Sequence, residues 1–339
     1  MLLICYGTRP EIIKLAPVIR ELLAQSIPFK SLFTGQHSTL YHQFKDLIPD
    51  PDYFIETPSG LSLNASMGNM LLKIDPILKS NQFKLMIVQG DTASAYVCSL
   101  AAFNQSIRIG HVEAGLRTND LSSPFPEEGY RQMISRIAAF NWAPTINSLI
   151  NLERENIFTG SVTGNTIVDQ CISYQLPIIY SDKVLVTLHR RENFGERMKK
   201  LFMELERLAT LHPELEIIFP MHPNPHVQMQ RPILSKVKVT EPIEYDAMIK
   251  LISEVKFVIS DSGGIQEECA SFRKKILVCR NTTERPEGIE AGFAKLIDTD
   301  ILNNYSWALN DPAWNGQNPY GDGQASKRIV TQIKGYLAV

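Results

Sequence analysis

The sequence alternates short apolar runs with longer amphipathic segments from its first residue onward. Apolar runs of strand length stand at residues 1–6, 29–34, 85–89, 108–112 and 161–162. The segments between them place apolar residues at helical spacing, as Ile12, Leu15 and Ile19 do in a helix expected over residues 11–23. Strands that alternate with helices pair in parallel and are covered on both faces, so the pattern predicts an α/β fold with a parallel sheet.

The alternation restarts after a less patterned stretch between residues 165 and 182. Strand candidates in the second half stand at residues 183–188, 215–219, 236–239, 256–259 and 275–278. A chain of 339 residues is also longer than one typical domain. We therefore predict two doubly wound α/β domains, over residues 1–168 and 169–321, with a terminal helix at 322–339 that packs back on the first domain.

The composition is that of an ordinary globular protein, with 44% hydrophobic residues, 21% charged residues and a net charge of −2. No segment carries the excess of Lys and Arg that is needed to neutralise a nucleic-acid phosphate backbone, so no nucleic-acid partner is expected. No apolar run approaches the roughly 20 residues that span a bilayer, and the first residues lack the pattern of a signal peptide. The five cysteines are scattered without a Cys-x-x-Cys pair, which predicts a reducing, cytoplasmic location.

Polar residues of chemical interest follow the predicted strands. Arg9, Asp91 and Glu113 each come shortly after a strand in the first half, and His189 and His222 do so in the second. Ligands of open α/β sheets bind at the carboxyl ends of the strands. We therefore expect two sets of polar strand ends to face each other across a cleft.

One strand end has the sequence of an anion-binding turn. A short apolar run breaks into Ser262-Gly263-Gly264 and continues as a helix that contains Glu268. Backbone N–H groups in the first helical turn, the helix dipole, the Ser262 hydroxyl and the missing Cβ atoms of the glycines can together hold a phosphate. Arg285 follows seventeen residues after Glu268. The same pattern is also typical of a glycine-rich turn that only joins a strand to a helix.

Four acids, Asp91, Glu113, Glu127 and Glu128, gather in the first half, and Arg131 follows the last of them. Carboxylates brought together in a cleft push their pKa values apart, so one can stay a proton donor while another serves as base. The set predicts proton transfer at a carbon that carries a leaving group. For each acid alone, a helix cap or a solvated ion pair is the simpler interpretation, and Glu127 stands at a helix start, where an acid is favourable.

The basic residues near strand ends are open to more than one interpretation. Arg9 is either a phosphate ligand or half of a surface salt bridge. Lys14 lies three residues after Glu11, so the two can form an intrahelical pair. His189 is followed by two arginines, which should lower its pKa and keep it neutral, as acceptor, base or hydrogen-bond donor, although it can also simply bind backbone at the strand end.

Motifs for metals and common nucleotide cofactors are missing from the sequence. His222 and His226 are separated by prolines that spoil helical geometry, so no metal site is expected. The turn after the first strand is not Gly-x-Gly-x-x-Gly, and there is no Gly-x-x-x-x-Gly-Lys-Ser/Thr, which argues against a typical dinucleotide site or P-loop.

Eight segments carry a stronger signal because they occur together and in order. They are Gly7-Thr-Arg-Pro-Glu-Ile-Ile-Lys14, Gly90-Asp-Thr92, His111-Val-Glu-Ala-Gly-Leu-Arg-Thr118, Pro124-Phe-Pro-Glu-Glu128, Thr187-Leu-His-Arg-Arg-Glu-Asn193, Ser260-Asp-Ser-Gly-Gly-Ile-Gln-Glu-Glu268, Thr282-Thr-Glu-Arg-Pro-Glu287 and Asn318-Pro-Tyr-Gly-Asp-Gly323. Any one of them is a weak match, whereas eight collinear segments from the first strand to the last helix are specific. Together they resemble the non-hydrolysing UDP-N-acetylglucosamine 2-epimerases.

The resemblance implies a GT-B fold, in which two Rossmann-like domains flank the active-site cleft. It also implies that UDP-N-acetylglucosamine (UDP-GlcNAc) and UDP-N-acetylmannosamine (UDP-ManNAc) are interconverted. In the family, UDP is eliminated as the C2 proton is removed, and UDP then adds back to the bound 2-acetamidoglucal. No cofactor or metal would be needed, and the chain would form a homodimer through its first domain.

Positions within the matching segments imply two sets of site residues. The set that would surround the sugar and handle protons is Asp91, Glu113, Glu127, Arg131 and His189. The set that would bind the UDP-sugar is Arg9, Lys14, His222, Ser262, Gly263, Gly264, Glu268 and Arg285. Within this set, Glu268 would accept hydrogen bonds from the ribose hydroxyls.

The chain departs from the family's pattern in two places. Tyr130 replaces the usual asparagine before Arg131, which can alter how the sugar is held. Many bacterial members carry Gln-His-Arg and a later arginine that bind a second, allosteric UDP-GlcNAc. Here Gln36-His37 is followed by Ser38, and residues 62–73 contain no arginine, so the sequence predicts that allosteric activation is weakened or absent.

Three other functions fit parts of the same pattern. A relative that epimerises a modified UDP-acetamido sugar, such as a diacetamido-uronic acid or a 6-deoxy sugar, would share the UDP-binding residues. A GT-B glycosyltransferase would need an acceptor groove, and the acids Asp91, Glu113 and Glu127 favour proton chemistry instead. A non-catalytic sensor would bind a nucleotide-sugar without turning it over.

Overall fold

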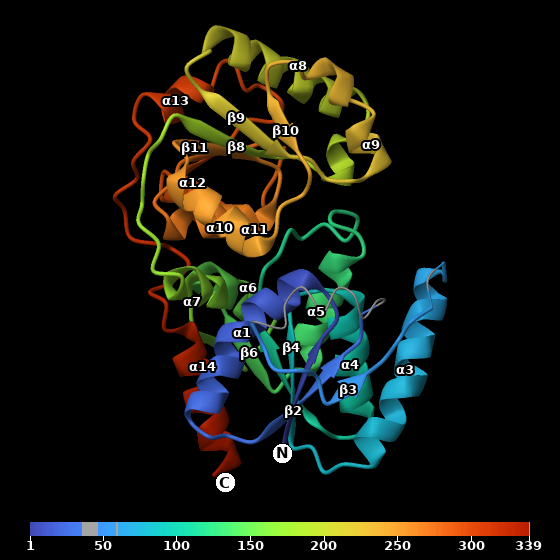
Figure 1. Cartoon of the computed structure of the whole chain (residues 1–339). Coiled ribbons are helices and arrows are strands. Elements are labelled where there is room, and N and C mark those ends of the chain that lie inside the picture. Colours follow the sequence, from blue (N-terminus) through green and yellow to red (C-terminus); the bar gives the residue numbers. More distant parts are fainter. Residues whose placement is uncertain (36–46, 59, 339) are drawn as a thin grey trace. The chain divides into compact units, whose positions relative to one another are not determined.

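The computed structural model describes residues 1–35, 47–58 and 60–338 of the chain. The chain divides into two compact units, unit 1 with residues 1–170 and 321–339, and unit 2 with residues 171–320. It leaves unit 1 within helix α7 (Thr166–Ser173) and returns to it for the last helix, α14 (Ala325–Leu337), as Figure 1 shows. Unit 1 is therefore made of two pieces that are far apart in the sequence.

Unit 1 is built on a parallel sheet whose strands, among the described residues, follow the order β3-β2-β1-β4-β5-β6-β7. The strands are β1 (Leu2–Tyr6), β2 (Phe29–Phe33), β3 (Tyr53–Phe54), β4 (Leu85–Gln89), β5 (Arg108–Val112), β6 (Phe140–Ala143) and β7 (Gly160–Val162). Sequential order reverses between β1 and β4, where Leu2 pairs with both Phe29 and Leu85. Loops after strands on either side of such a switch point diverge and leave room for a ligand.

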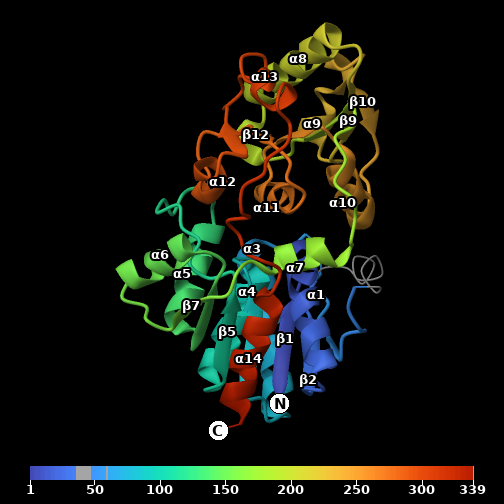
Figure 2. The same ribbon diagram turned by 90° about the vertical axis from the view of Figure 1, so that its left-hand side faces the viewer.

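Helices cover both faces of the unit 1 sheet (Figure 1 and Figure 2). They are α1 (Arg9–Ala24), α3 (Leu63–Lys79), α4 (Ala93–Asn104), α5 (Glu127–Ile137) and α6 (Ile146–Arg154), with α7 and α14. Alternate residues of β1, Leu3 and Cys5, pack into one core with α3 and α4. On the other face α1 and α14 lie side by side. Each fully buried Leu or Ile in such a core contributes about 1.5–3 kcal/mol.

Unit 2 repeats this plan with the strand order β10-β9-β8-β11-β12-β13 among the described residues. Its strands are β8 (Lys183–Thr187), β9 (Glu216–Pro220), β10 (Lys238–Thr240), β11 (Phe257–Ser260), β12 (Ile276–Val278) and β13 (Ala294–Leu296). Its helices are α8 (Glu196–Leu211), α9 (Pro225–Gln228), α10 (Tyr245–Glu254), α11 (Gly263–Ser271), α12 (Pro286–Glu290) and α13 (Tyr305–Leu309), with short 3-10 turns η1 (Arg191–Asn193) and η2 (Arg231–Ile233). Here the order reverses between β8 and β11.

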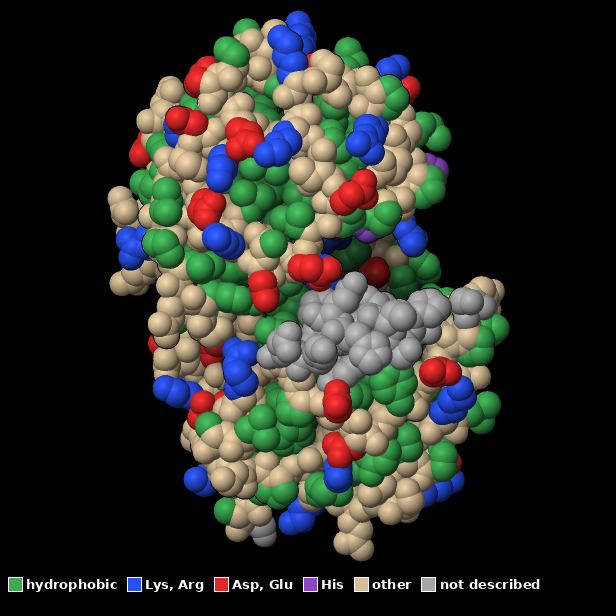
Figure 3. Space-filling model, viewed as in Figure 1, with side chains coloured by type: hydrophobic (Ala, Val, Ile, Leu, Met, Phe, Trp, Pro, Cys, Tyr) green, Lys and Arg blue, Asp and Glu red, His purple; other side chains and the backbone are tan. Residues whose placement is uncertain are grey.

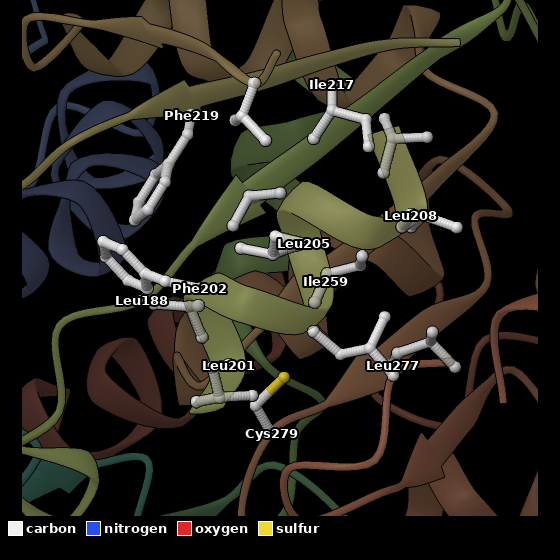
Figure 4. Close-up of a cluster of buried hydrophobic side chains, with 14 of the residues drawn as sticks. Leu188, Leu201, Phe202, Leu205, Leu208, Ile217, Phe219, Ile259, Leu277 and Cys279 are labelled. Atoms are coloured by element: carbon white, nitrogen blue, oxygen red, sulfur yellow. The ribbon is translucent and has the colours of Figure 1, made fainter. Parts of the chain in front are cut away.

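The core of unit 2 explains why α8 lies on its sheet. Leu201, Phe202 and Leu205 recur at helical spacing and are fully buried against strand residues such as Phe219 and Ile259 (Figure 4). The rings of Phe202 and Phe219 meet edge to face, with centroids 5.4 Å apart. Continuous apolar strands are typical of a parallel sheet covered by helices, because both faces of each strand are buried.

Two parallel sheets confirm the α/β fold predicted from the alternating pattern. The structure differs at residues 166–173, where the supposedly unpatterned stretch begins with helix α7 because Ile167, Val168 and Cys171 are buried. Strands β3, β6 and β13 were also not predicted. β6 does not form a continuous apolar run, because it is short and includes the fully buried Asn141.

The surface carries charges of both signs. On the face shown in Figure 3, Lys and Arg side chains are interspersed with Asp and Glu over each unit. Among the described residues, the helices include none that combines the length and the apolar character needed to cross a lipid bilayer.

Candidate active site

In unit 1, the buried carboxylate of Glu11 ties together the turns after β1 and β4. It accepts hydrogen bonds from the N–H groups of Gly7 and Thr8 at 3.1 and 2.7 Å, and from the Thr8 hydroxyl at 2.6 Å. It also accepts the Thr92 hydroxyl at 2.8 Å. Burial raises the pKa of Glu11, and these hydrogen bonds oppose that shift. Glu11 thereby fixes both loops at the switch point, including the one that carries Asp91.

Lys14 forms an ion pair with Glu113, which is far from it in the sequence. The two side chains are each only 8% exposed, so the ammonium compensates a largely buried carboxylate. Glu113 follows β5 with a φ of 66°, a left-handed conformation that is uncommon for residues other than glycine and is found at functional sites. The ion pair thus joins Lys14, from the predicted UDP-binding set, to Glu113, from the predicted catalytic set.

Arg131 joins the other acids into a second cluster. Its Nε donates to Asp91 Oδ2 at 2.9 Å, Nη2 binds the same oxygen, and Nη1 donates to Glu128 Oε2 at 3.2 Å. Glu128 is fully buried and also accepts the backbone N–H groups of Thr118 and Asn119, so it anchors the loop before α5. The sequence placed Glu128 among the gathered acids without assigning it this anchoring role.

The remaining predicted residues of unit 1 are Glu127 and Arg9. Glu127 begins α5, as its acidic character at a helix start suggested. Its Oε2 is buried and makes no hydrogen bond to any other described residue. Arg9 is half-buried in the first turn of α1. The roles assigned to these two residues stay predictions.

A buried histidine supports the loops that carry the acids. The ring of His111, on β5, makes a hydrogen bond of 2.7 Å through Nε2 to the carbonyl of Gly90 after β4. Burial lowers the pKa of His111 to about 4, so the ring is neutral near pH 7 and Nε2 is the donor. This bond joins the ends of the two strands that are followed by Asp91 and Glu113.

Tyr130 takes a packing position among helices. Its ring stacks on Tyr96 of α4, with centroids 5.0 Å apart and planes 7° from parallel, and its hydroxyl lies 3.3 Å from Met67 Sδ of α3. The side chain is 8% exposed. An effect of Tyr130 on the sugar stays a prediction, and the contacts seen here are those of a core residue.

In unit 2, α11 begins directly after β11, where the sequence predicted an anion-binding turn. Ser262 is the N-cap residue, and its side chain makes no capping hydrogen bond. Gly263 leaves room for Arg285: a Cβ there would lie 2.5 Å from Arg285 Nη1, so a larger residue would displace the guanidinium from its present position. Nothing lies within 4 Å of the corresponding position at Gly264. The turn has the backbone of an anion seat, and phosphate binding by it stays a prediction.

Asp261, which sequence analysis did not single out, organises the loop that carries His189. Its fully buried carboxylate accepts the N–H groups of His189 at 3.0 Å and Arg190 at 2.9 Å, and the side-chain amide of Asn193 at 3.0 Å. It also lies 3.6 Å from His189 Nδ1. Because Asp261 immediately precedes Ser262, one turn supports both the predicted anion seat and the predicted catalytic histidine.

His189 and His222 lie together. Their rings stack with centroids 5.4 Å apart, and His222 Nδ1 accepts the N–H of Asn224 at 3.1 Å. The pKa of His189 is lowered, as predicted, but burial is the main cause; Asp261 opposes the shift, while Arg190 and His222 add to it. The structure therefore places His222, which the sequence assigned to UDP binding, beside His189 of the predicted catalytic set.

Glu268, the predicted ribose ligand, is largely buried on α11. Burial raises the pKa of the Tyr245 hydroxyl, and the neighbouring Glu268 carboxylate adds to that effect. Tyr245 lies beside this predicted ligand, although no motif in the sequence pointed to it.

Gln36, His37 and Ser38, on which the allosteric prediction partly depends, lie outside the described residues. Within the described ranges, no group of three or more His, Cys, Asp or Glu side chains is arranged to hold a metal ion.

Comparison with known proteins decides the family. The family model described as UDP-N-acetylglucosamine 2-epimerase matches residues 21–334. The chain belongs to this family. The resemblance drawn from the eight collinear segments is thereby confirmed.

Two relatives illustrate the extent of the match to UDP-N-acetylglucosamine 2-epimerases. The enzyme of that name from Salmonella borreze is 40% identical over 97% of this chain and 96% of its own length. The one from Bacillus subtilis (strain 168) is 38% identical over 97% of this chain and 93% of its own. Both matches therefore extend over the two units of this chain.

Solved structures of the 2-epimerase family share the fold. The Neisseria meningitidis UDP-GlcNAc 2-epimerase, bound to UDP-GlcNAc, is 36% identical with a TM-score of 0.90 over 98% of this chain and 99% of that one. The Methanocaldococcus jannaschii enzyme, in complex with UDP-GlcNAc and UDP, is 30% identical with a TM-score of 0.83 over the same shares. MurG of Acinetobacter baumannii, at 15% identity and a TM-score of 0.52, shares the fold alone. The predicted GT-B fold is confirmed.

Proposed function

We propose that this chain interconverts UDP-GlcNAc and UDP-ManNAc by inverting the configuration at C2. The proposal rests on the family match along nearly the whole chain, which includes relatives whose structures hold UDP-GlcNAc. The names of these relatives do not favour a modified UDP-acetamido sugar as the substrate.

In the proposed reaction, acids of unit 1 move the proton, and His189 of unit 2 assists them. A carboxylate among Asp91, Glu113 and Glu127 takes the proton from C2, and a protonated group returns one to the opposite face of that carbon. Arg131 fixes the carboxylate of Asp91 through Nε and Nη2. His189, kept neutral by its lowered pKa, serves as a further acceptor or donor near the sugar.

Unit 2 holds the leaving group. As the C2 proton departs, the C1–O bond breaks, its electron pair leaves with UDP, and a C1=C2 double bond forms in 2-acetamidoglucal. The N-terminal turn of α11, with Ser262 and the neighbouring Arg285, stabilises the charge that grows on the diphosphate. Glu268 accepts the ribose hydroxyls, so UDP stays bound and adds back to C1 after C2 is reprotonated.

We also propose that the enzyme is a cytoplasmic homodimer that assembles through unit 1 and works without a cofactor or metal. The family resemblance supports the dimer and the cofactor-free reaction. All five cysteines are free thiols and all are buried, which suits a reducing compartment.

The test of this function is proton NMR of the purified protein with UDP-GlcNAc in deuterium oxide. UDP-ManNAc should form with deuterium at C2, because the proton is exchanged with solvent in the bound intermediate. Modified UDP-acetamido sugars, tested in parallel, should be inverted more slowly. Binding of UDP-GlcNAc without inversion or exchange would contradict the proposal and support a sensor or transferase.

A further inference from the structure

The guanidinium of Arg285 is held by two buried carboxylates of the same unit. Its Nε donates to Glu267 Oε1 at 2.6 Å, and Nη1 binds Glu284 Oε1. The side chains of Arg285, Glu267 and Glu284 are 8%, 1% and 4% exposed. Charge-assisted contacts of this kind, out of water, fix the plane of a guanidinium more firmly than surface pairs do.

The loop that carries Arg285 is also fastened to α11. Thr283 Oγ1 donates to Gln266 Oε1 at 3.1 Å and accepts the backbone N–H of Arg285 at 3.2 Å. Gln266 is fully buried and donates in turn to the carbonyl of Ser262 at 3.3 Å. Hydrogen bonds therefore run from the start of the loop to the N-cap residue of α11.

The guanidinium of Arg285 lies against the first turn of α11. Nη1 lies 2.5 Å from the place where a Cβ would stand at Gly263, and Glu284 Oε1 lies 3.0 Å from the same place. A buried charge network continues from Glu284 to Arg280, whose Nε donates to Glu192 at 2.8 Å. Although burial opposes it, Arg285, Arg280 and Arg190 hold the pKa of Glu284 well below its usual range, so the carboxylate stays charged.

We propose that Glu267 is a positioning residue, which, with Glu284, presets the guanidinium of Arg285 across Gly263 for the diphosphate of the nucleotide-sugar. This inference rests on the proposed function, because it assigns the anion at the α11 turn to UDP. Presetting lowers the ordering entropy that a flexible arginine would lose on binding, so the benefit falls on the diphosphate and not on the nucleoside.

The first test compares UDP with uridine as calorimetric ligands for Glu267→Gln. This variant keeps the size of the side chain and removes the charge that orients Nε. We expect UDP affinity to fall about 10-fold, which corresponds to about 1.4 kcal/mol, with uridine affinity unchanged. An equal loss for both ligands would indicate general damage to the unit and overturn the positioning role.

The second test is a double-mutant cycle with Arg285→Lys. A lysine ammonium has no Nε–H fork for Glu267 to orient, so adding Glu267→Gln to Arg285→Lys should weaken UDP binding no further. Additive losses would overturn the inference. The matched control is Glu155→Gln, which breaks the two-point Arg117–Glu155 pair of unit 1 and should leave UDP affinity unchanged.

The two levels of inference fail in different ways. If the wild-type protein did not bind UDP or invert C2, the proposed function itself would be wrong. If it did both, and Glu267→Gln bound UDP as tightly as the wild type, only the positioning role would be lost.

Discussion

The polar strand ends of the two units have opposite charge arrangements on the same sheet topology. In unit 1, cations from other elements reach the predicted acids: Lys14 meets Glu113, and Arg131 meets Asp91. In unit 2, the cation is central and carboxylates surround it, as Arg285 lies against both Glu267 and Glu284. We therefore infer that sheet topology determines where ligands can bind, while the partners of each charge determine whether a predicted site moves protons or holds an anion.

The largest expected effect tests the assignment of proton chemistry to unit 1. Glu113→Gln should lower epimerisation by about 10²–10⁴-fold, because an amide cannot take or return the C2 proton. UDP affinity should stay unchanged, since the predicted anion seat belongs to unit 2. NMR rates and calorimetry on the same protein would measure both quantities. A fall in UDP affinity as large as the fall in rate would remove the contrast between the units.

The next effect concerns the predicted catalytic residue that unit 2 contributes. His189→Ala should lower turnover by about 10²-fold while UDP still binds, because a neutral acceptor or donor near the sugar is lost. His226→Ala is the matched control, since His226 stacks on Phe194 of the same loop at 4.8 Å and has no predicted catalytic role. Equal losses in the two variants would mean that His189 only packs the loop.

A smaller change is expected from removing the central cation of unit 2. Arg285→Ala should weaken UDP binding by about 10- to 100-fold, the range expected for a lost hydrogen bond to a charged group. Arg328→Ala, which breaks an exposed pair with Asp322, serves as the control. If UDP affinity were untouched in Arg285→Ala, the anion would have to bind elsewhere.

Acid should weaken unit 1 through His111. Its folded pKa of about 4 lies below the value of about 6.5 in unfolded chains, so the unfolded state binds the proton first as pH falls. Stability from the neutral ring is therefore present above about pH 6.5 and is lost toward pH 4, by about 2 kcal/mol at pH 5. Urea unfolding at about pH 8 and pH 5 would measure it. His111→Gln should show a smaller loss, and an equal loss in both proteins would refute the assignment.

The smallest expected effect is the allosteric one. Rates with UDP-ManNAc as the substrate should change little when UDP-GlcNAc is added, because Ser38 and the arginine-free residues 62–73 depart from the family's regulatory pattern. Initial-rate measurements with and without the added nucleotide-sugar would decide the matter. Strong activation would show that other residues have taken over the regulatory site.

The sequence predicted local features well because local physics determines them. The turn at Ser262 and the helix start at Glu127 both appear where their short-range signals stood. The partner of Lys14 could not be predicted, because Glu113 is 99 residues away and only the fold brings them together. Asp261 was missed for a related reason. It contacts His189 and Asn193, which follow a different strand and are far from it in the sequence.

The placement of α14 in unit 1 has a consequence for synthesis of the chain. On the ribosome, all of unit 2 is made before the residues that pack beside α1 emerge. Until then, α1 lacks its neighbour, and Trp142 lacks the Gln332 side chain that accepts its indole N–H at 2.9 Å. Nascent unit 1 thus exposes apolar surface that chaperones can bind and that can aggregate. Premature termination within residues 321–339 would leave unit 1 without part of its core.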